Sequence, residues 1–170
     1  YDGYIASGGT EANIQAIWIY RNYFVQTYQA QLSEITILCS QDCHYSMDKA
    51  SNLLSIGVEK VVVTQETREV LKDAVLDAVN NAKTNGKKYF IVISNMMTTM
   101  FGSVDNVDNY TDVLQETSCI FKLHIDAAYG GFYYPFSDKF SKLTFENPHI
   151  SSFTLDAHKM AQAPSGTGIF

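Results

Sequence analysis

The chain has 170 residues, of which 46% are hydrophobic and 18% charged, so it is long enough for one globular domain with a sizeable core. Its net charge of −6 argues against nucleic acid or an anionic membrane as the main partner. The sequence contains no apolar run long enough to span a bilayer.

The three cysteines, Cys39, Cys43 and Cys119, are an odd number in mixed contexts. They predict free thiols in a reducing compartment, and with no secretory leader visible we expect a cytoplasmic protein. Cys39 and Cys43, with His44 beside them, have a spacing that suggests a metal site. However, Cys39 closes an apolar strand and a fourth ligand at suitable spacing is missing, so we expect no metal there.

The first motif along the chain is a glycine-rich turn, Ser7-Gly8-Gly9-Thr10-Glu11, that opens a helix. Apolar residues at helical spacing follow it over residues 12–24. We expect Thr10 or Ser7 to cap this helix and Glu11 to lie in its first turn. Free N–H groups and the positive end of the helix dipole make such a turn a phosphate site, although a plain cap is the commoner role of Gly-Gly-Thr.

Strands and helices then alternate with short connections. We expect strands at 35–39, 58–64, 89–94, 120–125 and 149–155, helices at 44–57, 68–84 and 108–117, and a loop at 132–148. This alternation predicts an α/β fold, a three-layer sandwich with a mainly parallel sheet.

Polar side chains follow the ends of several of these strands. Ligands of parallel sheets lie at the carboxyl ends of the strands, so side chains in that position converge on one edge. The groups concerned are Ser7 to Thr10, His44, Thr98 with Thr99, Asp126, and Lys159. Their shared position predicts a single site.

Lys159 is the group around which this site is interpreted. It follows an apolar strand and is flanked by Met160 and Ala161, which predicts a desolvated amine. A desolvated lysine loses part of its preference for the charged form and becomes a nucleophile able to form a Schiff base. Most lysines at strand ends are solvated, so the interpretation depends on the groups around it.

Together the groups describe a site for a phosphorylated pyridine aldehyde. The glycine-rich turn would bind the phosphate and Lys159 would form the Schiff base. His44 would stack on the ring, or merely cap the following helix. Asp126 would pair with a protonated ring nitrogen, or serve only as a turn residue. Ala128 is small enough to leave room for a flat ring.

Four motifs, in this order and approximate spacing, resemble those of the group II pyridoxal-phosphate-dependent amino-acid decarboxylases. They are Ser7-Gly8-Gly9-Thr10-Glu11-Ala12-Asn13, His44-x-Ser46-x-x-Lys49-Ala50, His124-x-Asp126-Ala127-Ala128-Tyr129-Gly130-Gly131 and Asp156-Ala157-His158-Lys159. That family has the fold type I, aspartate-aminotransferase-like architecture. The resemblance implies that residues 1–170 are the central part of the large pyridoxal-phosphate-binding domain, without the family's N-terminal segment and small C-terminal domain.

The resemblance also implies a role for each residue of the site. Lys159, His44 and Asp126 are its catalytic residues: Lys159 forms the Schiff base, Asp126 pairs with the pyridinium nitrogen, and His44 stacks on the ring. The other cofactor-binding residues are Ala128 on the opposite ring face, Thr98 before the Gly102-x-x-Asp105 motif, and a phosphate-holding group of Gly8, Gly9 and Thr10, helped by Asp156 and His158.

The activity that the resemblance implies is decarboxylation of an L-amino acid to the amine and carbon dioxide, with pyridoxal 5'-phosphate as the cofactor. The alternatives are a carbon–carbon lyase of the retro-aldol type acting on a phosphorylated amino alcohol, a desulfurase-like enzyme, or a degenerate, non-catalytic relative. The resemblance further implies a homodimer with its active site near the subunit interface. From the acidic net charge we expect no nucleic-acid or membrane partner.

Overall fold

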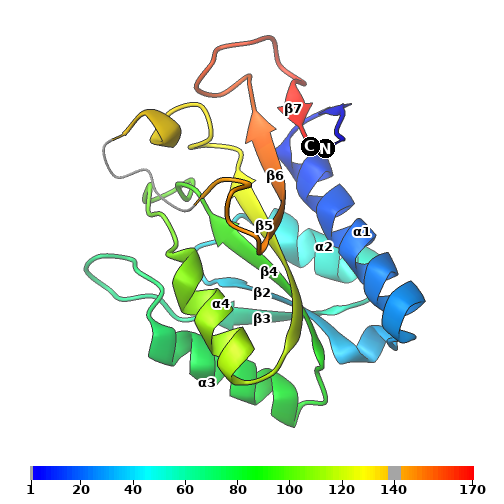
Figure 1. The fold of residues 1–170 in the computed structure, drawn as a ribbon. Coiled ribbons are helices and arrows are strands. Elements are labelled where there is room, and N and C mark those ends of the chain that lie inside the picture. Colours follow the sequence, from blue (N-terminus) through cyan, green and yellow to red (C-terminus); the bar gives the residue numbers. More distant parts are fainter. Residues whose placement is uncertain (1, 138–142) are drawn as a thin grey trace.

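One mixed sheet runs through residues 2–137 and 143–170, which are the residues that the computed structural model describes. Its strand order is β1-β7-β6-β5-β4-β2-β3 (Figure 1). The strands are β1 (Ile5–Ala6), β2 (Ile35–Ser40), β3 (Gly57–Val61), β4 (Tyr89–Asn95), β5 (Ile120–Ala127), β6 (Ile150–Asp156) and β7 (Gly168–Ile169). The helices are α1 (Gly9–Tyr28), α2 (Ser46–Leu54), α3 (Lys72–Thr84) and α4 (Val107–Glu116), with 3-10 turns at Leu32–Glu34 and Tyr134–Phe136.

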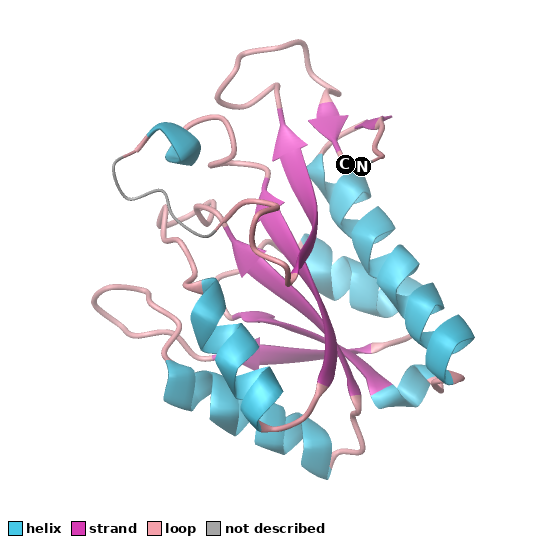
Figure 2. Cartoon of the chain, viewed as in Figure 1, coloured by secondary structure: helices cyan, strands magenta, loops and turns pink. Residues whose placement is uncertain are grey.

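The five central strands, from β3 to β6, are parallel, whereas β7 runs antiparallel to β6 and β1 antiparallel to β7. Helices α1 and α2 cover one face of the sheet, and α3 and α4 cover the other (Figures 1 and 2). The predicted three-layer α/β sandwich with a mainly parallel sheet is therefore confirmed. Within the described ranges, no helix combines the length and apolar character needed to cross a bilayer.

The alternation of side chains along β2 explains why both faces of the sheet must be covered. Ile35, Ile37 and Cys39 pack under α1 and α2, while Leu38 packs under α3 and α4. Every residue of β2 is buried. Strands buried on both faces are typical of parallel sheets, in which each crossover helix covers one face.

Helix α3 begins at Lys72, four residues later than the sequence predicts. Arg68 has a left-handed backbone, with φ of 58°, so it cannot belong to the helix. Its guanidinium donates to Asp42 on a neighbouring connection, with Nε 2.8 Å from Oδ2. Val63 and Val70 form an isolated antiparallel bridge across the same turn. The predicted strand at 58–64 correspondingly ends at Val61.

The predicted side-chain cap of α1 is wrong, because Gly8 occupies the N-cap position and no side chain caps this helix end. Glu11 lies in the first turn as predicted, and its carboxylate accepts a hydrogen bond from the Ser7 N–H at 2.8 Å. Thr10 lies at the carboxyl edge of the parallel strands. Residues 138–142 of the predicted loop at 132–148 lie outside the described residues.

Tyr110 on α4 gives a test of the core, because its side chain is fully buried and its hydroxyl has no hydrogen-bond partner among the described residues. A buried unpaired hydroxyl costs desolvation energy. We expect Tyr110→Phe to raise the free energy of unfolding by about 1 kcal/mol, measured by chemical denaturation of the full-length protein.

Tyr20→Phe is the matched control, because the Tyr20 hydroxyl is also buried but is hydrogen-bonded to Ser152 Oγ. In this variant the free energy of unfolding should instead fall by about 1 kcal/mol. Equal effects of the two substitutions would contradict the assignment.

Candidate active site

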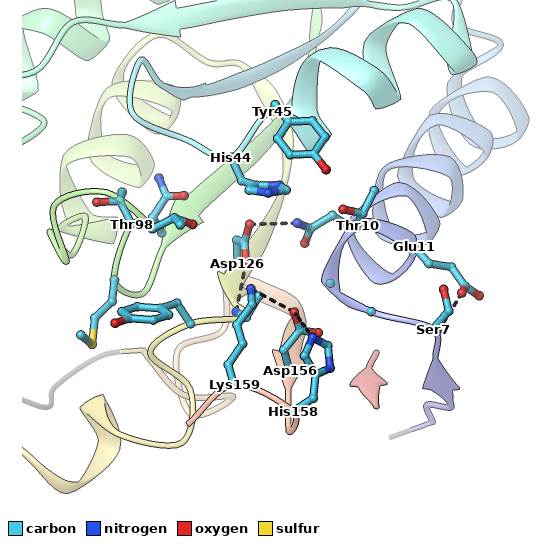
Figure 3. A pocket seen from close by; sticks show the side chains of 18 of the residues that line it. Ser7, Thr10, Glu11, His44, Tyr45, Thr98, Asp126, Asp156, His158 and Lys159 are labelled. Atoms are coloured by element: carbon cyan, nitrogen blue, oxygen red, sulfur yellow. Dashed lines mark hydrogen bonds and ion pairs between the residues drawn. The ribbon is translucent and has the colours of Figure 1, made fainter. Parts of the chain in front are cut away.

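The predicted site residues all line one pocket of about 340 Å³ at the carboxyl edge of the parallel strands (Figure 3). Its walls come from the turn before α1, from the connections after β2 and β4, from the end of β5, and from the segment after β6. The lining consists of Ser7, Gly8, Gly9, Thr10, Glu11, Asn13, His44, Tyr45, Asn95, Met97, Thr98, Thr99, Asp126, Ala128, Tyr129, Asp156, His158, Lys159 and Ser165. The predicted convergence on one edge is confirmed.

Asp126, near the end of β5, is the carboxylate at the floor of this pocket. Only 8% of its surface is exposed. Asn13 Nδ2 donates to its Oδ2 at 2.8 Å, and the Ala128 N–H donates to its Oδ1 at 3.1 Å. Burial raises the pKa of Asp126, while these two hydrogen bonds act in the opposite direction. A cation in the pocket would stabilise the charged form further.

Behind Asp126, hydrogen bonds continue through the core. Asn13 Oδ1 lies 3.1 Å from His124 Nε2, and His124 Nδ1 lies 2.7 Å from Ser152 Oγ, which in turn contacts the Tyr20 hydroxyl. These groups connect β5 with α1 and β6. Thr154 Oγ1 also lies 3.1 Å from His124 Nε2.

The direction of every bond in this network follows from the carboxylate at its end. An ionised Asp126 can only accept, so Asn13 must present its NH₂ group to it and its oxygen to His124. His124 therefore carries its proton on Nε2, and its Nδ1 accepts from Ser152. The Ser152 oxygen then accepts from Tyr20. Burial lowers the pKa of His124 to about 3, which is consistent with a neutral ring.

His44 stands on the other side of the pocket, on the connection between β2 and α2 (Figure 3). Its Nδ1 accepts the Ser46 N–H at 3.2 Å and lies 2.9 Å from Ser46 Oγ, so the ring does help to cap α2. Capping and lining the pocket are compatible, because the ring still borders the cavity. Burial lowers the pKa of His44, which favours a neutral ring.

Lys159 follows β6 and directs its amine into the pocket, where Nζ lies 3.0 Å from Asp156 Oδ2 (Figure 3). His158 Nε2 lies 3.7 Å from the same oxygen. The expectation of a desolvated lysine is wrong, because 33% of its side chain is exposed and Met160 is exposed as well. The amine is distinguished instead by its buried carboxylate partner, Asp156, of which 3% is exposed.

The uncapped start of α1 forms the third wall. Glycine is required at position 9, because a Cβ there would lie 2.9 Å from Asp156 Oδ2 and 3.0 Å from Ala128 Cβ. A Cβ at Gly8 would meet nothing closer than His158 Cε1 at 3.8 Å. The helix of 20 residues therefore presents its first N–H groups to the pocket across a backbone without side chains.

Thr98 and Met97 form the wall after β4. Thr98 is buried, and its hydroxyl lies 2.8 Å from Ser103 Oγ, so it is already engaged within its own turn. Met97 has a left-handed backbone, with φ of 68°, and packs against Gly130, where a Cβ would lie 2.9 Å from Met97 Cβ. A left-handed backbone at a non-glycine residue is uncommon, and such strained residues cluster at active sites.

Asn13 and Asn95 both line the pocket and are buried, although no role was predicted for either side chain. Asn95 donates from both its backbone and its side chain to Asp105 Oδ2, at 2.8 Å in each case. The spacing of Asn13 on α1, one turn after the glycine pair, was the available signal for a side chain facing the same pocket. In the described part of the chain, no group of three His, Cys, Asp or Glu side chains is placed to hold a metal ion.

The chain is similar to known proteins over its whole length. The model of the pyridoxal-dependent decarboxylase conserved domain matches residues 1–170. The tryptophan decarboxylase of Clostridium sporogenes is 52% identical over the whole chain, which spans 41% of that relative's length.

Two solved structures are similar in fold. One is the glutamate decarboxylase domain of a diaminobutyrate-pyruvate transaminase and L-2,4-diaminobutyrate decarboxylase from Vibrio parahaemolyticus. It has a TM-score of 0.85 and 22% identity, with 99% of this chain and 38% of that chain covered. The other is the sphingosine-1-phosphate lyase of Burkholderia pseudomallei, with a TM-score of 0.82, 21% identity, and 98% and 37% coverage. At these identities the likeness shows the fold alone.

The buried His124 gives a prediction about acid stability. An unfolded histidine binds a proton below a pH of about 6.5, whereas folded His124 does so only near a pH of about 3. Acid therefore favours the unfolded state, and the stability that depends on neutral His124 is lost as pH falls through this window. We expect a loss of about 1.4 kcal/mol per pH unit from this group.

Chemical denaturation of the full-length protein between pH 7 and pH 4 should show this slope, and His124→Gln should lack it. The opposing contribution of Asp105, whose pKa burial raises to about 6, is common to both proteins and cancels in the comparison. The half-buried His149 is the control, and His149→Gln should keep the slope. Parallel profiles for all three proteins would contradict the prediction.

Proposed function

This chain belongs to the pyridoxal-dependent decarboxylase family, and on that premise we propose that the protein carrying it converts an L-amino acid to the corresponding amine and carbon dioxide. The observation that carries the proposal is the meeting of Lys159, Asp126, His44 and the uncapped start of α1 around one pocket. The cofactor of this family is pyridoxal 5'-phosphate.

The residues of the pocket fit that cofactor. The open end of α1 suits a phosphate, because its free N–H groups and dipole attract an anion. His158 Nδ1 and Asp156 Oδ1 are buried without a partner among the described residues, so the pocket wall holds polar atoms for a ligand to satisfy. The buried Asp126 is stabilised in its charged form by a cation, which a protonated pyridine nitrogen provides.

Bound pyridoxal phosphate supplies a ring that withdraws electrons from the substrate's α-carbon when the carboxylate leaves. In our proposal Asp126 keeps the ring nitrogen protonated through its carboxylate. Asn13 and the Ala128 N–H hold that carboxylate in place, with contacts of 2.8 and 3.1 Å. These two donors also keep Asp126 acceptor-only, so that it receives a proton donor from the pocket side.

We assign to Lys159 the covalent attachment of the cofactor through Nζ. Asp156 Oδ2, 3.0 Å away, orients this amine and balances its charge while it is protonated. The lysine exposure of 33% leaves a path for an amino acid to approach and displace it. His158 contacts the same carboxylate and completes this side of the pocket.

The remaining roles concern the ring faces and the phosphate. His44 is proposed to stack on one ring face as a neutral imidazole, and Ala128 to pack on the other. The phosphate is assigned to the backbone of Gly8 and Gly9 and to the Thr10 hydroxyl. Thr98 borders the ring edge from the wall after β4; all these residues line the pocket.

We propose an aromatic amino acid as the substrate class. The relative that is 52% identical over the whole chain is a tryptophan decarboxylase, so tryptophan is the first amino acid to test. Because the chain spans 41% of that relative, we propose that residues 1–170 are the central part of the large cofactor-binding domain of a longer protein.

We also propose a cytoplasmic homodimer with its active site near the subunit interface. Met100 and Phe101, which follow the pocket residues Thr98 and Thr99, are 81% and 57% exposed. Apolar side chains of this size beside a pocket suit a surface that a second subunit covers. The three free cysteines are typical of a reducing compartment.

The close packing at Gly9 predicts a defect in cofactor binding. In Gly9→Ala the new methyl group would press on Asp156 Oδ2 and so disturb its contact with Lys159. We expect the affinity for pyridoxal phosphate to fall about tenfold or more, measured by absorbance titration of the full-length protein. Gly8→Ala is the matched variant and should have a smaller effect. A larger loss of affinity in Gly8→Ala than in Gly9→Ala would contradict this prediction.

The proposed activity predicts a covalent link at Lys159. Borohydride should fix pyridoxal phosphate onto the peptide that carries Lys159, as read by peptide mass mapping. Lys159→Ala should lose the label and turnover, whereas Lys87→Ala, which removes a distant lysine bonded to the Ser33 carbonyl, should keep both. A label on another lysine would refute the assignment.

Product analysis on a panel of amino acids that begins with tryptophan then identifies the reaction. We expect an amine and carbon dioxide in equal amounts. An aldehyde from a phosphorylated amino alcohol would indicate a retro-aldol lyase, alanine would indicate a desulfurase-like enzyme, and no product with any substrate would indicate a non-catalytic relative.

A further inference from the structure

Two of the free cysteines contact each other where β2 passes into the connection that carries His44. Cys39 is fully buried near the end of β2, and Cys43 is half-buried on the connection that follows. Their sulfur atoms are 3.4 Å apart. The Cys43 N–H donates to the Ser40 carbonyl at 3.2 Å, so a turn of the backbone brings Cys43 back over the strand end.

Lys60 on β3 makes the two thiols unequal. Its Nζ lies 3.1 Å from Cys43 Sγ, and its charge is shared with Asp48 Oδ2 at 3.2 Å. The hydrogen bond with Cys39 and the nearby Lys60 ammonium lower the pKa of Cys43, against the effects of burial and of Asp48. The hydrogen bond with Cys43 and burial raise the pKa of Cys39. Cys43 is therefore the more readily ionised of the two thiols, and Cys39, in contact with it, is the one that keeps its proton more strongly.

We propose that Cys43 and Cys39 form a peroxide-reactive thiol pair, a modification site next to the pocket but outside its lining. Cys43 is the attacking sulfur because it is partly exposed and lies 3.1 Å from the Lys60 ammonium, which favours its ionisation. Cys39 is the resolving sulfur because it is buried within contact distance. Cys119 lies on the connection between α4 and β5, where its sulfur is hydrogen-bonded to the Thr117 hydroxyl. It serves as the reference thiol in the oxidation experiment.

The chemistry balances with hydrogen peroxide as the oxidant. The Cys43 thiolate attacks one peroxide oxygen, the O–O bond breaks, and the departing hydroxide takes up a proton to become water. The product is a sulfenic acid on Cys43. Cys39, as it loses its proton, then attacks Cys43 Sγ, the S–O bond breaks, and the oxygen leaves as a second water. Two thiols lose two electrons in all, and one peroxide becomes two waters.

The disulfide would displace the connection that carries His44. The sulfurs must come about 1.4 Å closer to reach disulfide bonding distance. Cys39 is held by parallel pairing with β3 on one side and β4 on the other, whereas Cys43 lies outside the sheet. The movement therefore falls on Cys43 and on the adjacent His44. Where His44 contacts the cofactor, as in the proposed function on which this step rests, oxidation should weaken cofactor binding.

The test begins with the reduced full-length protein, treated with hydrogen peroxide, alkylated, and mapped by peptide mass spectrometry. We expect the peptide that contains Cys39 and Cys43 to lose two hydrogens and to resist alkylation until dithiothreitol is added. Cys43→Ser should abolish this product. Cys39→Ala should leave a sulfenic acid on Cys43 that dimedone captures, and Cys119→Ser should change nothing.

Lys60→Met tests the electrostatic part without altering either thiol. The alkylation rate of Cys43 near neutral pH should fall about threefold or more, with its pH profile shifted upward, because the thiolate fraction sets the rate. Lys49→Met is the control, since exposed Lys49 lies over the Tyr45 ring instead of beside a thiol. An unchanged profile in Lys60→Met would remove Lys60 from the site.

The outcomes separate the two parts of the proposal. Free alkylation of both thiols after peroxide, or oxidation at Cys119 alone, would overturn the thiol pair. If the disulfide forms, an absorbance titration with pyridoxal phosphate should show affinity several-fold weaker than in the reduced protein. Equal affinities would overturn the coupling to His44 and leave the pair standing. Failure of even the reduced protein to bind would count against the proposed function instead.

Discussion

The burial of one carboxylate, Asp126, organises the centre of this molecule. A carboxylate at the edge of an apolar sheet is costly unless donors surround it, and here the donors come from α1 and from the backbone after β5. Because the charged group can only accept, it sets the orientation of Asn13 and, through it, the tautomer of His124. The position of α1 against β5 and β6 is thereby tied to the charge state of the pocket.

Contacts with neighbouring segments also fix the β2–α2 connection. Three consecutive residues of this connection each have a partner in a different part of the chain. Asp42 pairs with Arg68, Cys43 contacts Lys60, and His44 bonds to Ser46. A histidine on a free loop would lose conformational entropy each time it packed against a ligand. Here the neighbours have already restricted it, so the pocket wall is largely formed in advance.

Local periodicity was sufficient to predict the fold and the edge at which the site lies, because alternating strands and helices leave few arrangements and strand ends meet at one edge. Contacts between distant residues were not predictable in this way. The later start of α3 depends on Arg68 reaching Asp42, and the lysine environment depends on Asp156. The need for glycine at position 9 depends on the close approach of Asp156. The roles of individual site residues stay predictions until they are tested chemically.

The antiparallel pairing of β1 with β7 has a consequence for the order of folding. Ile5 pairs with Ile169, and Gly168 fits against Gly8 so closely that a Cβ there would lie 2.6 Å from the Gly8 backbone. The turn before α1 and the segment that carries Lys159 are thus joined by contacts between residues about 160 positions apart in the sequence. Closing so long a loop costs conformational entropy, so we expect these contacts to form late in folding. During synthesis the central strands can assemble early, while the pocket acquires its lysine wall only after β7 has emerged and docked.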